Sequence, residues 1–578
     1  MNKQPAPHQT PPASFAVDPS SDDRVADIAA RTLHNHGVRL AFGMPGGEVV
    51  TFVDALEKAG IRFVLARHET AAAFMAAGSS VTHAAPGLLV TTVGPGLTNA
   101  LNGIADAAQE HVPLIVVSGV VDHALRHRYT HQVYDQADLV RPMVKASLEV
   151  EDVGVGATMA RAIRLAMRAP AGPVHVDLAP GTAAKPAGSS DNAVLPALPV
   201  EVRPLRLDSM PGGLAQMMSD ASRPVIIAGM GTIPGQGPSQ VVALAETLQA
   251  PVITTYKAKG VIRETDHPLS LGAAGLSPKA DALLLPFVGA ADLVILAGYD
   301  PIEMRPGWLD PFGKSATVVD LCDYPADHAM HTATHRVIGP LEDTLHACIN
   351  GIAAHRATVE RPKNGAALPV ETSPAGRLGD GLKALKSELE QAFAPPTQWG
   401  PHAVIDDLQA ALDNTTTITV DSGAHRILLS QMLRVWQPRQ LQQSAGFCTM
   451  GTALPSAIGI KMADPDRHVI AVLGDGGLEM GLGELATLRD TQTAVTIVVF
   501  QDESLALIEL KQDQAGLACN GVRLGATPFE DIATAYGGVG IRVASCDALA
   551  DALKAARSCA TFTLIACTLE AQDYVDRI

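Results

Sequence analysis

The chain contains the stretch Val469-Ile470-Ala471-Val472-Leu473-Gly474-Asp475-Gly476-Gly477, an apolar run that ends in a glycine-rich turn. A helix is predicted to follow over residues 478–489. A buried strand that ends in such a turn at the start of a helix presents backbone N–H groups and the positive end of the helix, which together suit a phosphate. The same residues also fit a plain tight turn that binds nothing.

A second apolar run, over residues 494–500, ends at Gln501-Asp502-Glu503-Ser504. Asp475 and Asp502 are 27 residues apart, which matches the end of one strand, a helix and a returning parallel strand. We therefore expect both carboxylates at the carboxyl edge of one sheet. Mg²⁺ takes oxygen ligands and is usually shared with phosphates. The two strand ends predict a clamp for a metal ion and a diphosphate, with Asp475, Asp502 and Ser504 as metal ligands.

The clamp resembles the thiamine diphosphate motif of the acetohydroxyacid synthase and pyruvate decarboxylase superfamily in its Gly474-Asp475-Gly476 turn, its 27-residue spacing and its second acid. The common form of that motif ends in Asn, whereas this chain has Asp502, which is similar to the catabolic, flavin-independent acetolactate synthases. The substitution keeps an oxygen ligand. The resemblance implies that thiamine diphosphate and Mg²⁺ bind at Asp475, Gly476, Gly477 and Asp502.

The composition excludes several classes of protein. The chain has 578 residues, of which 47% are hydrophobic and 18% charged, and a formal charge of −17, which argues against a nucleic-acid partner. No apolar stretch is long and unbroken enough to span a bilayer, so we expect no membrane partner. The seven cysteines are scattered without a Cys-x-x-Cys pair, so neither disulfides nor zinc are expected. We expect a cytoplasmic enzyme.

Apolar runs alternate with helical patterns in three successive segments, which predicts an α/β fold with three doubly wound parallel-sheet domains. The resemblance assigns them as pyrimidine-binding, central and diphosphate-binding domains of the thiamine diphosphate enzyme superfamily. We expect the following boundaries: a disordered tail over 1–20, the first domain over 21–183, the central domain over 200–352, a connector over 353–400 and the third domain over 401–578.

Two loops of the first domain resemble acetolactate synthase motifs. Residues Gly43-Met44-Pro45-Gly46-Gly47 match a Gly-x-Pro-Gly-Gly loop, and Thr92-Val93-Gly94-Pro95-Gly96-Leu97-Thr98-Asn99 matches a Ser/Thr-x-Gly-Pro-Gly-x-x-Asn loop. The first match implies that Gly46 and Gly47 lie at the substrate. A glycine turn without function is the alternative for that loop.

Glu69 follows an apolar run, in Arg67-His68-Glu69-Thr70, and begins a predicted helix. In the related enzymes, a glutamate at the matching place bonds to the pyrimidine ring of the cofactor and promotes its reactive tautomer. A carboxyl group that holds or shares a proton needs an apolar setting, which the following Ala and Phe residues supply. The alternative is a charge that stabilises the positive end of the helix. We expect Glu69 to be catalytic and to bind the cofactor.

His111, which precedes a predicted strand at Val112-Pro113-Leu114, departs from the acetolactate synthases. Benzoylformate decarboxylase has a catalytic His before a similar strand, so His111 is either a catalytic proton donor and acceptor or a polar loop residue. Further along, His131-Gln132-Val133-Tyr134-Asp135 and the segment 141–145 resemble catabolic acetolactate synthases. Gln132 is the preferred substrate contact, whereas Arg141 and Lys145 either meet the substrate carboxylate or are surface charges.

Two more segments of the third domain match the family. Residues Asp421-Ser422-Gly423-Ala424-His425 end a predicted strand, so Ser422, Gly423, Ala424 and His425 bind the cofactor diphosphate or form a structural helix cap. Gly446-Phe447-Cys448-Thr449-Met450-Gly451 resembles a segment whose methionine lies beneath the bent cofactor. Met450 is therefore expected to contact the cofactor, as is the backbone carbonyl of Cys448, and a core role for Met450 is the alternative.

The central domain carries Gly298-Tyr299-Asp300-Pro301-Ile302-Glu303 where flavin-binding synthases carry a Gly-Ala-Arg-Phe-Asp-type segment. The arginine that would meet a flavin diphosphate is absent, so no FAD is expected. The resemblance implies that the cofactor lies between domains of two chains, in a homodimer that pairs into a homotetramer.

The implied reaction is decarboxylation of a 2-oxo acid, by default pyruvate, followed by joining to a second carbonyl of an aldehyde or ketone. One alternative is a 2-oxo acid decarboxylase or a benzaldehyde lyase-type enzyme, which releases or joins aldehydes. A non-catalytic cofactor-binding subunit is the alternative of a different class.

Overall fold

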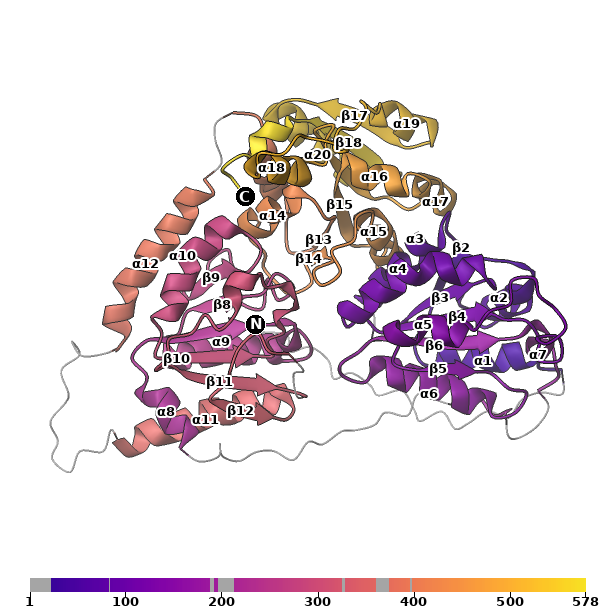
Figure 1. Cartoon of the computed structure of the whole chain (residues 1–578), viewed down its shortest axis with the longest axis horizontal. Helices are drawn as coiled ribbons and strands as arrows, with labels where there is room; N and C mark the ends of the chain where they lie inside the picture. Colours follow the sequence, from indigo (N-terminus) through magenta and orange to yellow (C-terminus); the bar gives the residue numbers. More distant parts are fainter. Residues whose placement is uncertain are drawn as a thin grey trace, which may run out of the picture. The chain divides into compact units, whose positions relative to one another are not determined.

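The structure is a computed structural model that describes residues 22–82, 84–187, 192–195, 213–324, 328–359, 374–394 and 398–578. The tail predicted over residues 1–20 lies outside the described residues. The chain divides into two compact units, Met1–Arg203 and Pro204–Ile578. The first unit contains one six-stranded parallel sheet and the second contains two (Figure 1). The prediction of an α/β fold with three parallel sheets is therefore confirmed.

The sheet of the first unit has the strand order β2-β1-β3-β4-β6-β5. Its strands are β1 (Leu40–Met44), β2 (Arg62–Leu65), β3 (Gly87–Thr91), β4 (Leu114–Gly119), β5 (Ser147–Glu149) and β6 (Pro173–Leu178). Strands β3, β4 and β6 are buried along their whole length, which explains why they appear in the sequence as continuous apolar runs.

Helices cover both faces of this sheet (Figure 1). Helices α3 and α4 pack against each other, and α3 also contacts β1 and β3, whereas α1 packs with α2 and α6. The helices are α1 (Val25–Asn35), α2 (Val50–Lys58), α3 (Glu69–Ser80), α4 (Pro95–Gln109), α5 (Gln136–Val140), α6 (Val155–Met167) and α7 (Pro180–Ala183). Proline at the first position of α4 suits a helix start, because it has no N–H group to leave unpaired.

The second unit begins with a sheet of strand order β12-β11-β10-β7-β8-β9. Its strands are β7 (Pro224–Ala228), β8 (Val252–Thr254), β9 (Ser270–Ala273), β10 (Leu293–Ala297), β11 (Thr317–Cys322) and β12 (His335–Ile338). The helices of this part are α8 (Leu214–Asp220), α9 (Gly237–Leu248), α10 (Pro278–Gly289), α11 (Leu341–Val359) and α12 (Pro374–Ala392). The last two overlap the connector predicted over residues 353–400.

The third sheet has the strand order β14-β13-β15-β16-β18-β17. Its strands are β13 (Thr416–Val420), β14 (Leu441–Gln443), β15 (His468–Gly474), β16 (Thr496–Gln501), β17 (Val539–Val543) and β18 (Thr563–Thr568). Its helices are α13 (Pro401–Ala411), α14 (Ala424–Met432), α15 (Ala453–Ala463), α16 (Asp475–Gly481), α17 (Glu484–Thr491), α18 (Ala506–Gln514), α19 (Phe529–Ala535) and α20 (Cys546–Arg557).

The predicted single helix over residues 478–489 is wrong. The structure has two helices there, since α16 begins at Asp475 and ends at Gly481, and α17 begins at Glu484. Glycine is a weak helix former, and Gly481 and Gly483 flank the break.

One hydrophobic core joins the two sheets of the second unit, with members such as Ile295 of β10 and Ile470 of β15. A buried ion pair lies at this junction. The Lys259 ammonium is 2.8 Å from Glu264 Oε2, and the two side chains are 2% and 4% exposed. Glu264 Oε2 also accepts a hydrogen bond from the Val435 N–H at 3.2 Å, so a residue of the central part is bound to the backbone of the third.

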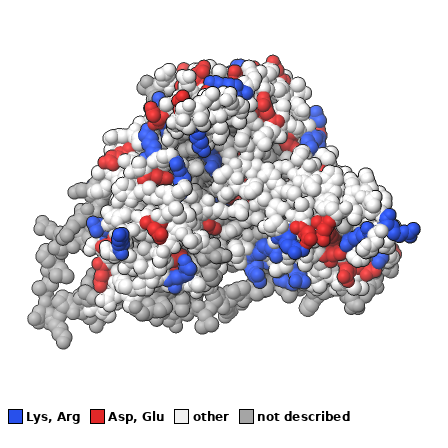
Figure 2. Space-filling model, viewed as in Figure 1, with Lys and Arg blue, Asp and Glu red and all other residues white. Residues whose placement is uncertain are grey.

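Among the described residues, no helix has the length and apolarity that crossing a bilayer requires. On the face that Figure 2 shows, acidic and basic side chains lie among one another.

Candidate functional site

Asp475 and Asp502 lie at the carboxyl ends of β15 and β16, which are neighbouring parallel strands. Asp475 Oδ1 accepts a hydrogen bond from the Gly476 N–H at 2.8 Å, and Oδ2 accepts one from the Glu503 N–H at 2.6 Å. Asp502 Oδ1 accepts a hydrogen bond from the Ser504 N–H at 3.1 Å. The structure thus brings the two acids to one edge of one sheet, as the spacing predicts.

The surroundings of this acid pair disfavour its full ionisation. Burial and, next, the charge of Asp475 raise the pKa of Asp502 to about 8, and burial also raises the pKa of Asp475. A divalent cation would reverse both effects, because it would stabilise the two negative charges.

In the part of the chain that the structure describes, no group of three or more His, Cys, Asp or Glu side chains is arranged to hold a metal ion. A cation at Asp475 and Asp502 would therefore need oxygen ligands from elsewhere, which a diphosphate could supply. The Ser504 hydroxyl donates a hydrogen bond to the Glu509 carboxylate, and its oxygen retains lone pairs for a metal.

His425 lies in the first turn of α14 with its ring against two backbone turns. A Cβ atom at Gly423 would be 2.5 Å from His425 Cε1, and one at Gly474 would be 3.5 Å from it, so the first of these turns requires glycine. Burial lowers the pKa of His425 to about 3, so the imidazole is neutral. Its buried Nε2 has no hydrogen-bond partner within the described structure. A phosphate oxygen would satisfy this nitrogen as an N–H donor.

The turn that carries Cys448 and Met450 is fixed by Asp421, to which sequence reasoning assigned no role. The fully buried Asp421 carboxylate accepts hydrogen bonds from the N–H groups of Gly451 and Thr452, both at 2.8 Å. A signal for it was available, because Asp421 directly follows a buried strand, as Asp475 and Asp502 do. The Ser422 hydroxyl donates to the Cys448 carbonyl at 2.7 Å, which links the two predicted segments.

All the predicted cofactor and metal residues of the second unit line one cavity of about 580 Å³. They are Ser422, Gly423, Ala424, His425, Cys448, Met450, Asp475, Gly476, Gly477, Asp502 and Ser504. The chemistry of this set fits thiamine diphosphate with a divalent cation, because it combines two carboxylates, a neutral donor without a partner and closely packed glycines.

Glu69 in the first unit is the first residue of α3 and is 5% exposed. Its Oε2 accepts a hydrogen bond from Asn99 Nδ2 at 3.0 Å. A Cβ atom at Gly96 would be 3.5 Å from Glu69 Oε1, so the first turn of α4 lies against this carboxylate. Glu69 is thus buried, and Asn99 is a contact that sequence reasoning did not assign.

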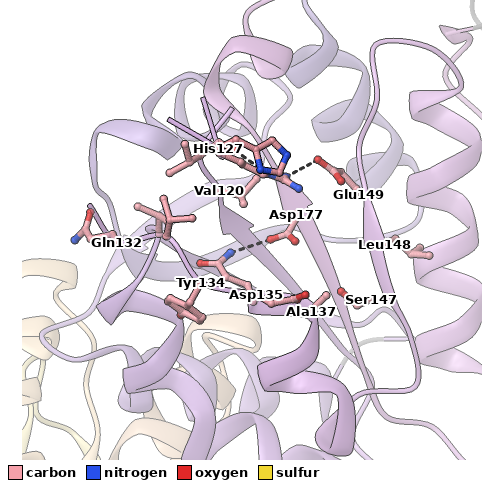
Figure 3. A pocket seen from close by; sticks show the side chains of 15 residues that line it. Val120, His127, Gln132, Tyr134, Asp135, Ala137, Ser147, Leu148, Glu149 and Asp177 are labelled. Atoms are coloured by element: carbon pink, nitrogen blue, oxygen red, sulfur yellow. Dashed lines mark hydrogen bonds and ion pairs between the residues drawn. The ribbon is translucent and has the colours of Figure 1, made fainter. Parts of the chain in front are cut away.

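Gly46 belongs to the same group of loops at the carboxyl edge of the first sheet. A Cβ atom at Gly46 would be 2.1 Å from Thr92 Oγ1, whereas one at Gly47 would meet nothing within 4 Å. Gln132 lies against Gly94 and lines a separate cavity of about 520 Å³ in the first unit (Figure 3).

The remaining candidates of the first unit have other surroundings. Lys145 Nζ donates to the carbonyls of Arg168 and Pro170, at 2.5 and 2.7 Å, and Arg141 pairs with Asp138. These contacts favour structural and surface roles for Lys145 and Arg141.

His111 is half-buried and follows the carboxyl end of α4, at the amino edge of the sheet, with a φ of 52°. Asn99, which bonds Glu69, lies near the other end of α4, about 15 Å away along the helix. Within the first unit, the structure therefore does not bring His111 to Glu69.

Comparison with known proteins agrees with this arrangement. Residues 23–139 match the family "Thiamine pyrophosphate enzyme, N-terminal TPP binding domain", residues 213–348 match its central domain and residues 421–567 its C-terminal TPP binding domain. An acetolactate synthase of Bacillus subtilis (strain 168) is 30% identical over 540 residues, which are 92% of this chain and 90% of the relative. A catabolic acetolactate synthase of Raoultella terrigena is 27% identical over 92% of both chains. The acetolactate synthase isozyme 1 large subunit of Escherichia coli (strain K12) is 29% identical over 84% of this chain and 83% of the relative.

These matches include both thiamine-binding domains. The chain therefore belongs to the thiamine pyrophosphate enzymes, among relatives of acetolactate synthase type.

Proposed function

We propose that this enzyme uses thiamine diphosphate and Mg²⁺ to decarboxylate a 2-oxo acid, by default pyruvate, and joins the remaining fragment to a second carbonyl. The observation that carries the proposal is the single cavity in which Asp475, Asp502 and the unpartnered His425 Nε2 converge. The printed names of the relatives support an acetolactate synthase type of reaction.

Each residue of the clamp has a distinct task. Asp475 and Asp502 would hold the cation, and the cation would bind the diphosphate. His425 would donate its Nε2–H to a phosphate oxygen, and Met450 would support the cofactor from below. Asp421 keeps the Met450 turn in place through its two backbone hydrogen bonds.

When bound, thiamine diphosphate supplies a nucleophilic carbon and an electron sink for the loss of CO₂. Glu69 would hold a proton at its carboxyl group and donate it in a hydrogen bond to the pyrimidine ring. The burial of Glu69 excludes water from this bond, and Asn99 Nδ2 orients the carboxyl group by bonding its other side. Gly46, Gly47 and Gln132 are the proposed substrate contacts.

The alternative activity, which releases aldehydes, would need a proton donor such as His111. The position of His111 at the far end of α4 gives this alternative no support within the first unit. A non-catalytic binding subunit is disfavoured because Glu69 and both acids of the clamp are present.

We propose that the active form is a homodimer with sites between chains, paired into a homotetramer. Large apolar side chains near the clamp support such a partner, since Phe447 is 45% exposed and Met480, which lies beside Gly451, is 66% exposed. We also propose a cytoplasmic location, which the seven free cysteines support.

The first prediction concerns the metal. EDTA should abolish activity, and Asp475→Ala should weaken the binding of thiamine diphosphate with Mg²⁺ by about 2–5 kcal/mol, because a carboxylate ligand is lost. Asp502→Asn should retain binding, because the amide oxygen remains a ligand and a repulsive charge disappears. Isothermal titration calorimetry measures the affinity of each variant for the cofactor with Mg²⁺. Asp513→Ala is the control, because Asp513 is an exposed acid outside the cavity. Full activity of metal-free, cofactor-free protein would contradict the proposal.

The second prediction concerns flavin. Because the segment Gly298–Glu303 lacks an arginine, the purified protein should carry no FAD. A visible absorption spectrum tests this expectation, and a yellow protein with stoichiometric flavin would refute it.

The third prediction concerns the sites between chains. Glu69→Ala and Asp475→Ala should each be inactive, but mixed dimers of the two variants should regain activity, because one of their two sites combines an intact Glu69 with an intact Asp475. Each variant mixed with itself is the control. If the mixed dimers form and remain inactive, each site is built within one chain.

The fourth prediction separates the two activities. His111→Gly keeps the left-handed backbone, because glycine adopts a φ of 52° without strain, and removes only the imidazole. The ratio of joined product to free aldehyde should not change. Loss of a general acid typically costs about 10²–10⁴-fold, so a fall of about tenfold or more in aldehyde release would favour the decarboxylase alternative.

A further inference from the structure

The side chain of Gln136 links the loop after β3 to the carboxyl ends of β4 and β6 in the first sheet. Gln136 is the first residue of α5 and is 2% exposed. Its Oε1 accepts a hydrogen bond from the Gly94 N–H at 3.2 Å, and its Nε2 donates to the Gly119 carbonyl at 3.0 Å and to Asp177 Oδ1 at 2.9 Å. Both hydrogens of the amide are therefore used, and the buried group is fully satisfied.

Gly94 is the residue that Gln136 fixes most directly. It precedes the first residue of α4, and its φ of 73° and ψ of −113° are open to glycine but unfavourable for other residues. The Tyr134 hydroxyl donates to the Gly94 carbonyl at 3.0 Å. Gln136 and Tyr134 thus bond the N–H and the carbonyl of Gly94, respectively. These two bonds fix the backbone directly before α4.

The start of α4 in turn holds Glu69. Asn99 Nδ2 donates to Glu69 Oε2 at 3.0 Å, and the Asn99 carbonyl accepts a hydrogen bond from Thr70 Oγ1 at 2.5 Å. On the other side of the carboxylate, a Cβ atom at Gly96 would be 3.5 Å from Glu69 Oε1 and 2.9 Å from Thr92 Cγ2. A shift of α4 along its axis would therefore move the groups that contact both oxygens of Glu69.

We propose that Gln136 is a positioning residue for Glu69, which acts by fixing Gly94 and the first turn of α4. The inference rests on the proposed role of Glu69 toward the cofactor. Gln136 itself is four residues from the proposed substrate contact Gln132, and both side chains line the 520 Å³ cavity.

Asp177 gives this arrangement a pH dependence that can be tested. The carboxyl group lines the 520 Å³ cavity, where Figure 3 shows it below Glu149. Burial raises the pKa of Asp177 to about 6, although the bond from Gln136 opposes this. Glu149 of β5 and Asp135 raise the pKa further, and Arg126 lowers it.

Two further titratable groups lie beside Asp177. His175 of β6 has its Nε2 3.5 Å away, and burial, followed by the charge of Asp177, raises the pKa of Tyr134. Burial lowers the pKa of His175 to about 4, so the ring is neutral near pH 6. Asp177 is therefore ionised above pH 6 and then accepts a charge-assisted bond from Gln136.

The experiment measures how fast the C2 proton of bound thiamine diphosphate exchanges with D₂O, without substrate, by NMR after an acid quench. Glu69→Gln sets the rate that remains without the carboxyl group. Gln136→Ala should slow exchange about 10–100-fold, because a small displacement of a positioned group has an effect of this size. The affinity for the cofactor should not change, because the clamp is untouched.

Gln440→Ala is the matched control. Gln440 is also a buried glutamine, at 1% exposed, and it bonds the Trp436 N–H at 2.9 Å and the Asp413 carbonyl at 2.7 Å, in the second unit. Both substitutions should lower the melting temperature by similar amounts, but Gln440→Ala should leave the exchange rate at the parent value.

The variant Gln136→Glu gives a signature that a purely structural role would not produce. The new carboxyl group can accept from the Gly94 N–H at any pH, but it can donate to Asp177 or Gly119 only when protonated. Exchange should therefore approach the parent rate below about pH 6 and fall above it, where two carboxylates would repel each other.

Two results would overturn the inference. A Gln136→Ala protein that exchanges at the parent rate shows that Glu69 is placed without Gln136. If Gln136→Ala does not fold, a Gln136→Glu protein that exchanges at the parent rate above pH 6 has the same meaning. A parent rate in Glu69→Gln, by contrast, would refute the proposed role of Glu69 itself, so the two failures are distinguishable.

Discussion

Two buried carboxyl groups at the edge of the third sheet disfavour each other's ionisation. Asp475 and Asp502 bond to consecutive peptide N–H groups, those of Glu503 and Ser504, and both are largely buried. Like charges this close in a low dielectric raise each other's pKa, and either protonation of one acid or a cation between them removes the repulsion. Asp421 adds a third buried acid, but one that the backbone of the Met450 turn satisfies. The second unit thus presents an anionic edge that becomes favourable when a metal and a diphosphate complete it.

The parallel arrangement of the strands explains which parts of the candidate site can be predicted from the sequence. Continuous apolar runs predict buried parallel strands, and a parallel sheet places the carboxyl ends of its strands at one edge, so the pairing of Asp475 with Asp502 follows from spacing. The same rule, applied to the first domain, separates His111 from Glu69, because His111 precedes a strand and Glu69 follows one. This rule therefore counts against the resemblance of the short His-x-Pro-Leu segment, for which the sequence alone left both roles of His111 open.

Other features depend on contacts that no local pattern contains. Gln136 bonds residues 42, 17 and 41 positions away in the chain, and Asn99 meets Glu69 across 30 positions. Such side-chain bonds require the positions of whole loops, which periodicity does not supply. The break between α16 and α17 does have a local signal in the sequence, because Gly481 and Gly483 lie beside it and glycine is a weak helix former. The helical pattern on both sides of these glycines nevertheless favours one continuous helix.

The buried pair of Lys259 and Glu264 has a consequence for folding during synthesis. Glu264 reaches its remaining partner, the Val435 N–H, 171 residues later in the chain. At about 5–20 residues per second, a ribosome needs roughly 10–30 s to add that segment. During this interval the nascent central part lacks this hydrogen bond and the residues that the third sheet adds to the shared apolar core. Chaperones that bind exposed apolar surface would therefore meet this chain at the stage between its second and third sheets.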